Sequence, residues 1–179
     1  MTTAPLLERH HRLTIVVHGR PAPQGSKAYK GHRTNAATGR RTAILVEQSK
    51  RVAPWRHLVT TATRAAAAEQ IATHVKQHHD WPTHLTQPLD GPLEADIVFT
   101  VLKPASAPKR KRTWPTTRHS GDVDKLIRST FDGITDAQAI ADDSRIIRVT
   151  ATKTFPGEHP EALSEPGAVI RLYTLGDPS

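Results

Sequence analysis

The sequence HSGDVDKLIRSTFDGITDAQAIADDSR, residues 119–145, carries the pattern around which the rest of the chain is arranged. Its apolar residues recur at the spacing of one helix face: Val123, Leu126, Ile127, Phe131 and Ile134. We therefore predict an amphipathic helix that starts close to residue 123. Acidic residues gather at both ends of this stretch, in a chain that is otherwise basic.

Two pairs of aspartates flank the predicted helix. Asp122 and Asp124 stand at its start, and Asp142 and Asp143 follow in a loop before a β-branched run. Helix residues advance by about 100° each, so Asp122 and Asp124 would diverge inside a helix, whereas residues i and i+2 of an extended segment share a face. We expect Asp122 to precede the helix and Asp124 to start it. Neighbours on an extended segment point apart, so only one of Asp142 and Asp143 is expected to be a ligand, with the other structural.

The two pairs can converge on a single point, and this convergence predicts a metal site. Carboxylates brought together repel one another unless a cation offsets their charge. Ligation by oxygen alone suits Mg²⁺ or Mn²⁺ and argues against zinc. Arg128 lies four residues after Asp124 on the same helix face, where it would steady a phosphate or pair with Asp124 and Asp132. Helix capping alone would explain one aspartate of the first pair, but it does not explain the second pair.

The charge of the chain points to a polyanionic partner. The formal net charge is +8 and the sequence pI is about 10.2, for which nucleic acid is the leading partner. The cations cluster in two arms, residues 19–42 and 103–118, although a solvated loop is an alternative for the first arm. We predict that these arms bind DNA phosphates through Arg20, Lys27, Lys30, Arg33, Arg40, Arg41, Lys109, Arg110, Lys111, Arg112 and Arg118.

The whole chain, residues 1–179, is expected to form one mixed α+β domain. Patterns of β-branched and alternating residues predict strands at 13–18, 93–102, 145–155 and 168–175, and helical spacing predicts a long helix over 49–79. A short strand at 43–47 would close the first arm into a loose hairpin. This order predicts a small mixed sheet packed against two main helices. The chain has no cysteine and no apolar run long enough to cross a bilayer.

The motif at 121–135, GDVDKLIRSTFDGIT, followed by Asp142-Asp-Ser-Arg-Ile-Ile, resembles the signature of the RusA family of Holliday-junction resolvases, common in phages and prophages. The resemblance covers residues 119–155 closely, and Pro-x-Pro-x-Gly-Ser-Lys at 21–27 and the helix with Trp55-Arg56 fit it loosely. It implies a RusA-like domain with its catalytic core at about 119–155. It also implies a Mg²⁺- or Mn²⁺-dependent homodimer that cuts four-way junctions by paired symmetric incisions, in the cytoplasm of a bacterial or phage-infected cell.

The resemblance also assigns roles to single residues. The metal-binding aspartates carry over onto Asp122, Asp124 and Asp143, and the catalytic basic residue onto Arg128. The chain departs from the best-known pattern, which has Lys at the position of Arg128 and Asn at that of Lys125. Arg and Lys are not interchangeable in proton transfer, so we expect Arg128 to stabilise charge. Lys125, like Asp132 and Asp142, would support the site or the fold.

Two other functions fit parts of this pattern. In a non-catalytic or weakly catalytic DNA- or RNA-binding protein, the acids would cap a helix and the arms would do all the binding. In a metal-dependent nucleotidyl or glycosyl transferase, the Asp-x-Asp pair would hold a nucleotide diphosphate. The chain lacks a Gly-rich G-x-G-x-x-G loop, which lowers the second alternative.

Overall fold

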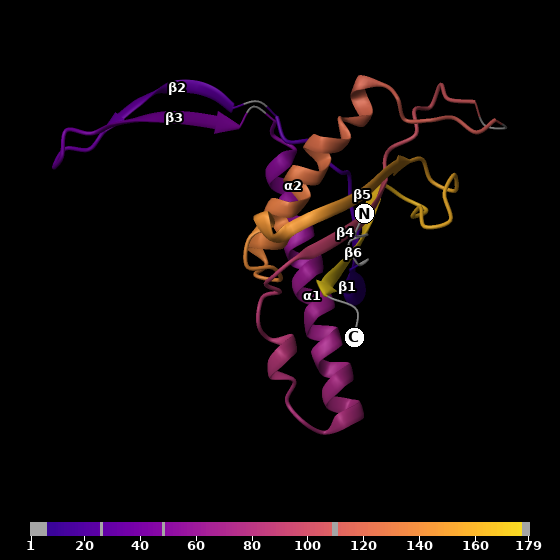
Figure 1. Ribbon diagram of the computed structural model, residues 1–179. Coiled ribbons are helices and arrows are strands. Elements are labelled where there is room, and N and C mark those ends of the chain that lie inside the picture. Colours follow the sequence, from indigo (N-terminus) through magenta and orange to yellow (C-terminus); the bar gives the residue numbers. More distant parts are fainter. Residues whose placement is uncertain (1–6, 26, 48, 109–110, 177–179) are drawn as a thin grey trace, which may run out of the picture.

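A four-stranded sheet with two helices forms the body of the protein, and a two-stranded hairpin projects from it (Figure 1). The computed structural model describes residues 7–25, 27–47, 49–108 and 111–176. In the sheet the strand order is β1(Glu8–His18), β6(Gly167–Gly176), β4(Leu93–Thr100) and β5(Ile146–Thr154). β4 pairs antiparallel with β6 and parallel with β5, so it is an inner strand of a mixed sheet, as predicted. The predicted α+β class is confirmed.

Two long helices pack together beside this sheet. They are α1(Val52–His78) and α2(Val123–Asp136), close to the ranges predicted from apolar spacing. The indole nitrogen of Trp55 donates a buried hydrogen bond of 3.1 Å to the hydroxyl of Thr130, which fixes the crossing of the helices. At Gly133 an added Cβ would lie only 2.8 Å from Cβ of Val59, so this glycine allows the close approach. The core is formed by the apolar face of α2, the inner face of α1 and the inward residues of β1, β4 and β6.

The start of β1 differs from the prediction. The apolar pattern predicted a strand from residue 13, but β1 begins at Glu8, and its first residues pair with the end of β6. The buried residues of β1 are Leu13, Ile15 and Val17, while its first four residues are exposed. Backbone pairing at an exposed sheet edge needs no apolar side chains, and hydrophobic periodicity therefore underestimates such a strand.

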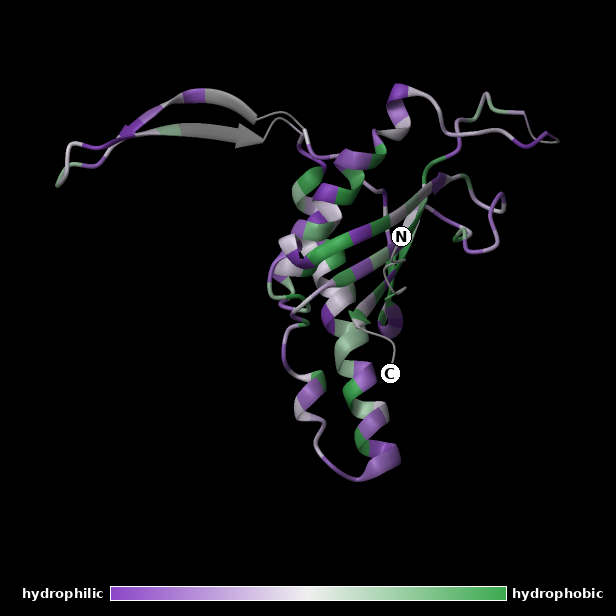
Figure 2. Cartoon of the chain, in the orientation of Figure 1, coloured by the Kyte–Doolittle hydropathy of each residue, from purple (hydrophilic) through white to green (hydrophobic). Residues whose placement is uncertain are grey.

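The first basic arm is an ordered hairpin of β2(Lys27–Thr34) and β3(Arg41–Glu47), which confirms the predicted closing strand. At its turn the side-chain oxygen of Asn35 accepts bonds from the backbone nitrogens of Ala37 and Thr38, at 2.9 and 3.2 Å. Figure 2 shows that the distal part of the hairpin is mostly hydrophilic or neutral, whereas hydrophobic residues concentrate in the sheet and the helices. No described helix is both long and apolar enough to cross a membrane.

Candidate functional site

The first acidic pair lies at the N-terminus of α2 with the geometry predicted. Asp122 is the N-cap residue in an extended conformation, with φ −81° and ψ 138°, and Asp124 lies in the first turn. The Asp122 side chain makes no capping hydrogen bond. Its carboxylate instead pairs with the ammonium of Lys125, at 2.9 Å. Helix capping therefore does not account for Asp122.

Asp122 is held ionised by its cationic surroundings. The hydrogen bond from Lys125, and then the charge of Lys125, lower the pKa of Asp122, and the charges of Lys153 and Arg118 act in the same direction. Lys125 in turn has a raised pKa because of Asp122, with a further contribution from Asp124. The carboxylate is exposed and charged at neutral pH, the state that a cation ligand requires.

The backbone ahead of Asp122 is fixed by close packing. Gly121 has φ 79°, a conformation that favours glycine, and atoms of the Pro23 ring lie 3.0 to 3.2 Å from the place of a Cβ. The backbone amide of Gln24 donates to the backbone carbonyl of Lys125 at 3.0 Å, and the hydroxyl of Ser129 donates to the backbone carbonyl of Ala22 at 2.7 Å. The proline-rich root of the first arm is thereby docked on the first turns of α2.

Lys153 completes this support, and sequence reasoning missed it. From the end of β5 its ammonium donates to the carbonyl of Gly121 at 2.5 Å and to the hydroxyl of Ser120 at 2.9 Å. Burial lowers the pKa of Lys153, and the charge of Asp122 opposes that shift. Lys153 thus links the sheet to the backbone just before Asp122. A lysine at the end of a strand carries no local signal of a contact 32 residues earlier in the chain.

Arg128 and Asp132 do not pair with each other, although they lie one turn apart on α2. Arg128 is exposed one turn after Asp124, and within the described part of the chain it has no ion-pair or hydrogen-bond partner. The alternative that Arg128 pairs with Asp132 is wrong, because Asp132 forms an ion pair with Arg56 of α1 instead. Asp132 therefore links the two helices, and the guanidinium of Arg128 remains available to an anion.

The second acidic pair lies at the opposite end of α2. Asp142 caps the short turn Asp143–Arg145, where its carboxylate accepts a bond of 2.9 Å from the amide of Ser144. The hydroxyl and amide of Ser144 lower the pKa of Asp142. Asp143 is exposed and lines a polar cavity of about 660 Å³, which also includes Arg56 and Asp136.

The expected convergence of the two pairs is therefore not met within one chain. The 14 residues of α2 span about 21 Å and separate Asp143 from Asp122 and Asp124. The connection after α2 is held there because Leu89 exchanges backbone hydrogen bonds of 2.9 Å with Ala139 and Ala141. Across the described residues, no group of three or more His, Asp or Glu side chains is arranged to hold a metal ion.

The roots of the two basic arms meet beside Asp122. Arg20 lines a cavity of about 220 Å³ together with Thr117, His119 and Ser120. In the second arm the guanidinium of Arg112 lies 4.1 Å from the ring centroid of Trp114, which is 56% exposed. The exposed cations of the arms are Arg20, Lys30, Arg33, Arg40, Arg41, Lys111, Arg112 and Arg118. Lys109 and Arg110 lie outside the described residues, as does the side chain of Lys27.

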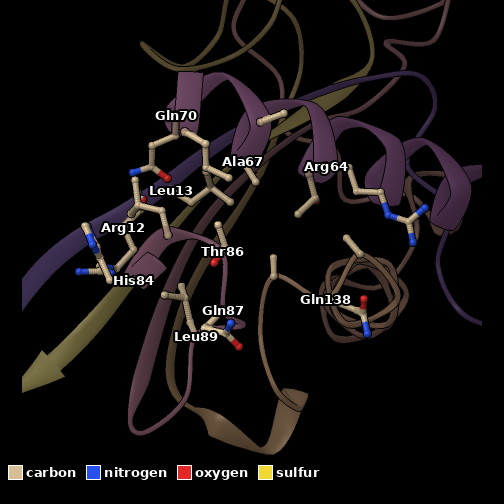
Figure 3. Close-up of a pocket in the computed structure, with 16 residues that line it drawn as sticks. Arg12, Leu13, Arg64, Ala67, Gln70, His84, Thr86, Gln87, Leu89 and Gln138 are labelled. Carbon is tan, nitrogen blue, oxygen red and sulfur yellow. Dashed lines mark hydrogen bonds between the residues drawn. The ribbon is translucent and has the colours of Figure 1, made fainter. Parts of the chain in front are cut away.

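Another cavity, of about 320 Å³, lies between α1, the turn at Thr83–Leu85 and the residues after α2 (Figure 3). Arg12, Arg64 and Gln138 line it together with apolar side chains, and no carboxylate does. Neither the first acidic pair nor any of the basic arm residues borders it. This cavity therefore does not belong to the site at the start of α2.

Exposed carboxylates beside cationic arms fit a metal-assisted nuclease that acts on DNA. The family model of endodeoxyribonuclease RusA matches residues 20–165 of the 179, a range that includes both acidic pairs, Arg128 and Lys153. The chain therefore belongs to the RusA family of Holliday-junction endodeoxyribonucleases. Comparison with curated proteins gave no match.

Proposed function

We propose that this protein is a Mg²⁺- or Mn²⁺-dependent resolvase that cuts four-way DNA junctions by paired symmetric incisions as a homodimer. The observation that carries the proposal is the pair of exposed carboxylates, Asp122 and Asp124, at the start of α2 beside the roots of two acid-poor basic arms. Family membership supports the endonuclease activity. The bacterial or phage-infected cytoplasm is the setting that fits such an enzyme.

The donor set fits Mg²⁺. This ion is commonly bound through one or two carboxylates and keeps several waters, and Asp122 and Asp124 supply two exposed carboxylates. When bound, the ion lowers the pKa of a water ligand and neutralises charge on phosphoryl oxygens. Lys125 and Lys153 hold Asp122 in place from two sides, through its carboxylate and through the backbone before it.

Arg128 is suited to bind the phosphate that is cut. Its guanidinium has no partner among the described residues, and it projects from the same helix face as Asp124. A planar guanidinium binds two phosphate oxygens at once and remains charged at all physiological pH values. We therefore assign Arg128 to stabilising negative charge and not to proton transfer.

A homodimer would unite the acids that one chain keeps apart. β5 is an edge strand of the sheet, and its side chains Ile147 and Val149 are 61% and 39% exposed. An apolar edge strand is a ready surface for pairing with a second strand. If two β5 strands pair antiparallel about a two-fold axis, the start of each lies beside the end of the other. Asp143 would then approach the end of the partner's β5, where Lys153 contacts the residue before Asp122.

A junction-cleavage assay tests the proposal. The protein is incubated with Mg²⁺ and a synthetic four-way junction, beside linear duplex and single strand of the same sequence. We expect symmetric nicks on the junction that disappear in EDTA and in Asp122→Asn or Asp143→Asn, with junction binding retained. Binding without metal-dependent cleavage by the wild-type protein would contradict the nuclease function and favour a DNA-binding role.

A further inference from the structure

The β2–β3 hairpin is a basic ribbon, and its distal part packs on no other element among the described residues. Its strands pair with each other and project away from the four-stranded sheet and both helices (Figure 1). From His32 to Ala43 every residue is exposed. An isolated two-stranded hairpin is only marginally stable in water, so this element gains most from a surface supplied by another molecule.

Beyond Glu47 at its base, which stands opposite Lys27, the ribbon carries charge of one sign. From residue 19 to 46 the chain contains no Asp or Glu. None of the ion pairs in the described structure involves Lys30, Arg33, Arg40 or Arg41. A projecting element with several free guanidinium groups fits a polyanion, and the proposed function supplies one in duplex DNA.

The strand register places cations on both faces of the ribbon. Arg33 pairs with Thr42, and Thr34 pairs with Arg41. Residues paired across two strands share a face, and successive residues of a strand alternate between faces. Arg33 and Arg41 therefore point to opposite sides. A ribbon that lay flat on a single phosphate backbone would use only one of these faces, and the other arginine would remain in solvent.

We propose that the β2–β3 hairpin inserts into the major groove of a duplex arm, with Arg33 and Arg41 reaching the phosphate backbones on its two sides. The major groove is about 12 Å wide and admits a two-stranded ribbon, whose strands lie about 4.8 Å apart. Phosphate contacts of this kind fix the orientation of the protein without reading sequence. The inference rests on the proposed function only in taking DNA as the ligand.

Salt titration of DNA binding tests the insertion. Asp122→Asn protein, without metal, is titrated into a fluorescent linear duplex and into a four-way junction at several salt concentrations. The slope of log K against log salt is negative, and each lost phosphate contact reduces its magnitude by about 0.9. We expect Arg33→Ala and Arg41→Ala each to reduce the magnitude of the slope by about 0.9, and the double variant by about 1.8. Lys76→Ala, an exposed cation in the last turn of α1, is the control and should leave the slope unchanged.

Chemical probing identifies the groove. Dimethyl sulfate methylates guanine N7, which lies in the major groove. We expect the Asp122→Asn protein to protect guanines of the duplex arm, and the Arg33→Ala, Arg41→Ala double variant to lose that protection. A slope change for only one arginine, or for neither, would overturn the insertion, as would unprotected N7 atoms under saturating protein. If the Asp122→Asn protein binds neither DNA, the proposed function itself fails.

Discussion

Mixing two inactive variants tests whether the metal site is shared between chains. Ligands of one Mg²⁺ lie about 2.1 Å from it, so their oxygens are within about 4.2 Å of one another. The helix between Asp122 and Asp143 spans about 21 Å, far more than an aspartate rotamer change can bridge. In the proposed homodimer, Asp143 would therefore reach the first acidic pair from the partner subunit.

The expected magnitude follows from the two-fold symmetry. Asp122→Asn and Asp143→Asn homodimers each lack one ligand at both sites. In a mixed dimer one site carries both lesions, and the other site carries neither. After complete subunit exchange at equal concentrations half of the dimers are mixed, so about a quarter of the wild-type sites are restored.

The assay is single-turnover cleavage of a four-way junction by the mixture, with the mixed dimer verified by native mass spectrometry. The product should be a junction nicked in one strand, because each mixed dimer has one competent site. A mixture of Asp122→Asn with Asp124→Asn is the matched control, since both lesions fall in the same half of the site and no site is restored. Cleavage no higher than that control, despite verified mixed dimers, would refute a site shared between chains.

Three further predictions concern the support of the site. Lys153→Met removes the hydrogen bond to the Gly121 carbonyl. We therefore expect the cleavage rate to fall at least tenfold while the junction affinity stays within about twofold. A loss of binding without a further loss of cleavage would contradict the positioning role. Lys125→Ala should raise the pKa of Asp122 towards its ordinary value, because the hydrogen bond and charge that lower it are gone; a carboxyl NMR titration without metal measures this, and an unchanged pKa would contradict it. Gly133→Ala would place a Cβ 2.8 Å from Cβ of Val59 and should lower the free energy of unfolding by about 1–3 kcal/mol, measured by urea titration. Gly176→Ala is the control and should have no effect, since nothing lies within 4 Å of the place of its Cβ.

The pH dependence of the Asp122–Lys125 pair has a defined sign. The pKa of Asp122 is lowered in the folded state, so the pair contributes to stability at neutral pH, above the ordinary aspartate value of 3.8. This contribution is lost as the pH falls through the folded pKa, which lies below 3.8. The proposed metal-dependent cleavage needs the ionised carboxylate, so Asp122 should not limit it above about pH 5.

Local rules of the chain predicted much of the first acidic pair. For an Asp-x-Asp at the start of an amphipathic helix, i,i+2 geometry predicts that the first aspartate precedes the helix, and Asp122 is indeed the extended N-cap residue with Asp124 in the first turn. Apolar periodicity likewise predicted α1, α2 and the inner strand β4. These features depend on residues within one or two turns of each other, which is the range that sequence pattern covers.

Contacts between distant segments decided the rest. The backbone pairing of Leu89 with residues 139–141 keeps Asp143 at the far end of α2, and no pattern near residue 143 encodes that pairing. Lys153 and Asp132 found their partners, Gly121 and Arg56, across 32 and 76 positions. The sequence by itself thus determined the acidic helix start and its basic arms, because both arise from local spacing and charge. Only the tertiary structure decided how far Asp143 lies from Asp122 and Asp124, because that distance depends on the length of α2 and on the backbone pairing that holds the chain after it.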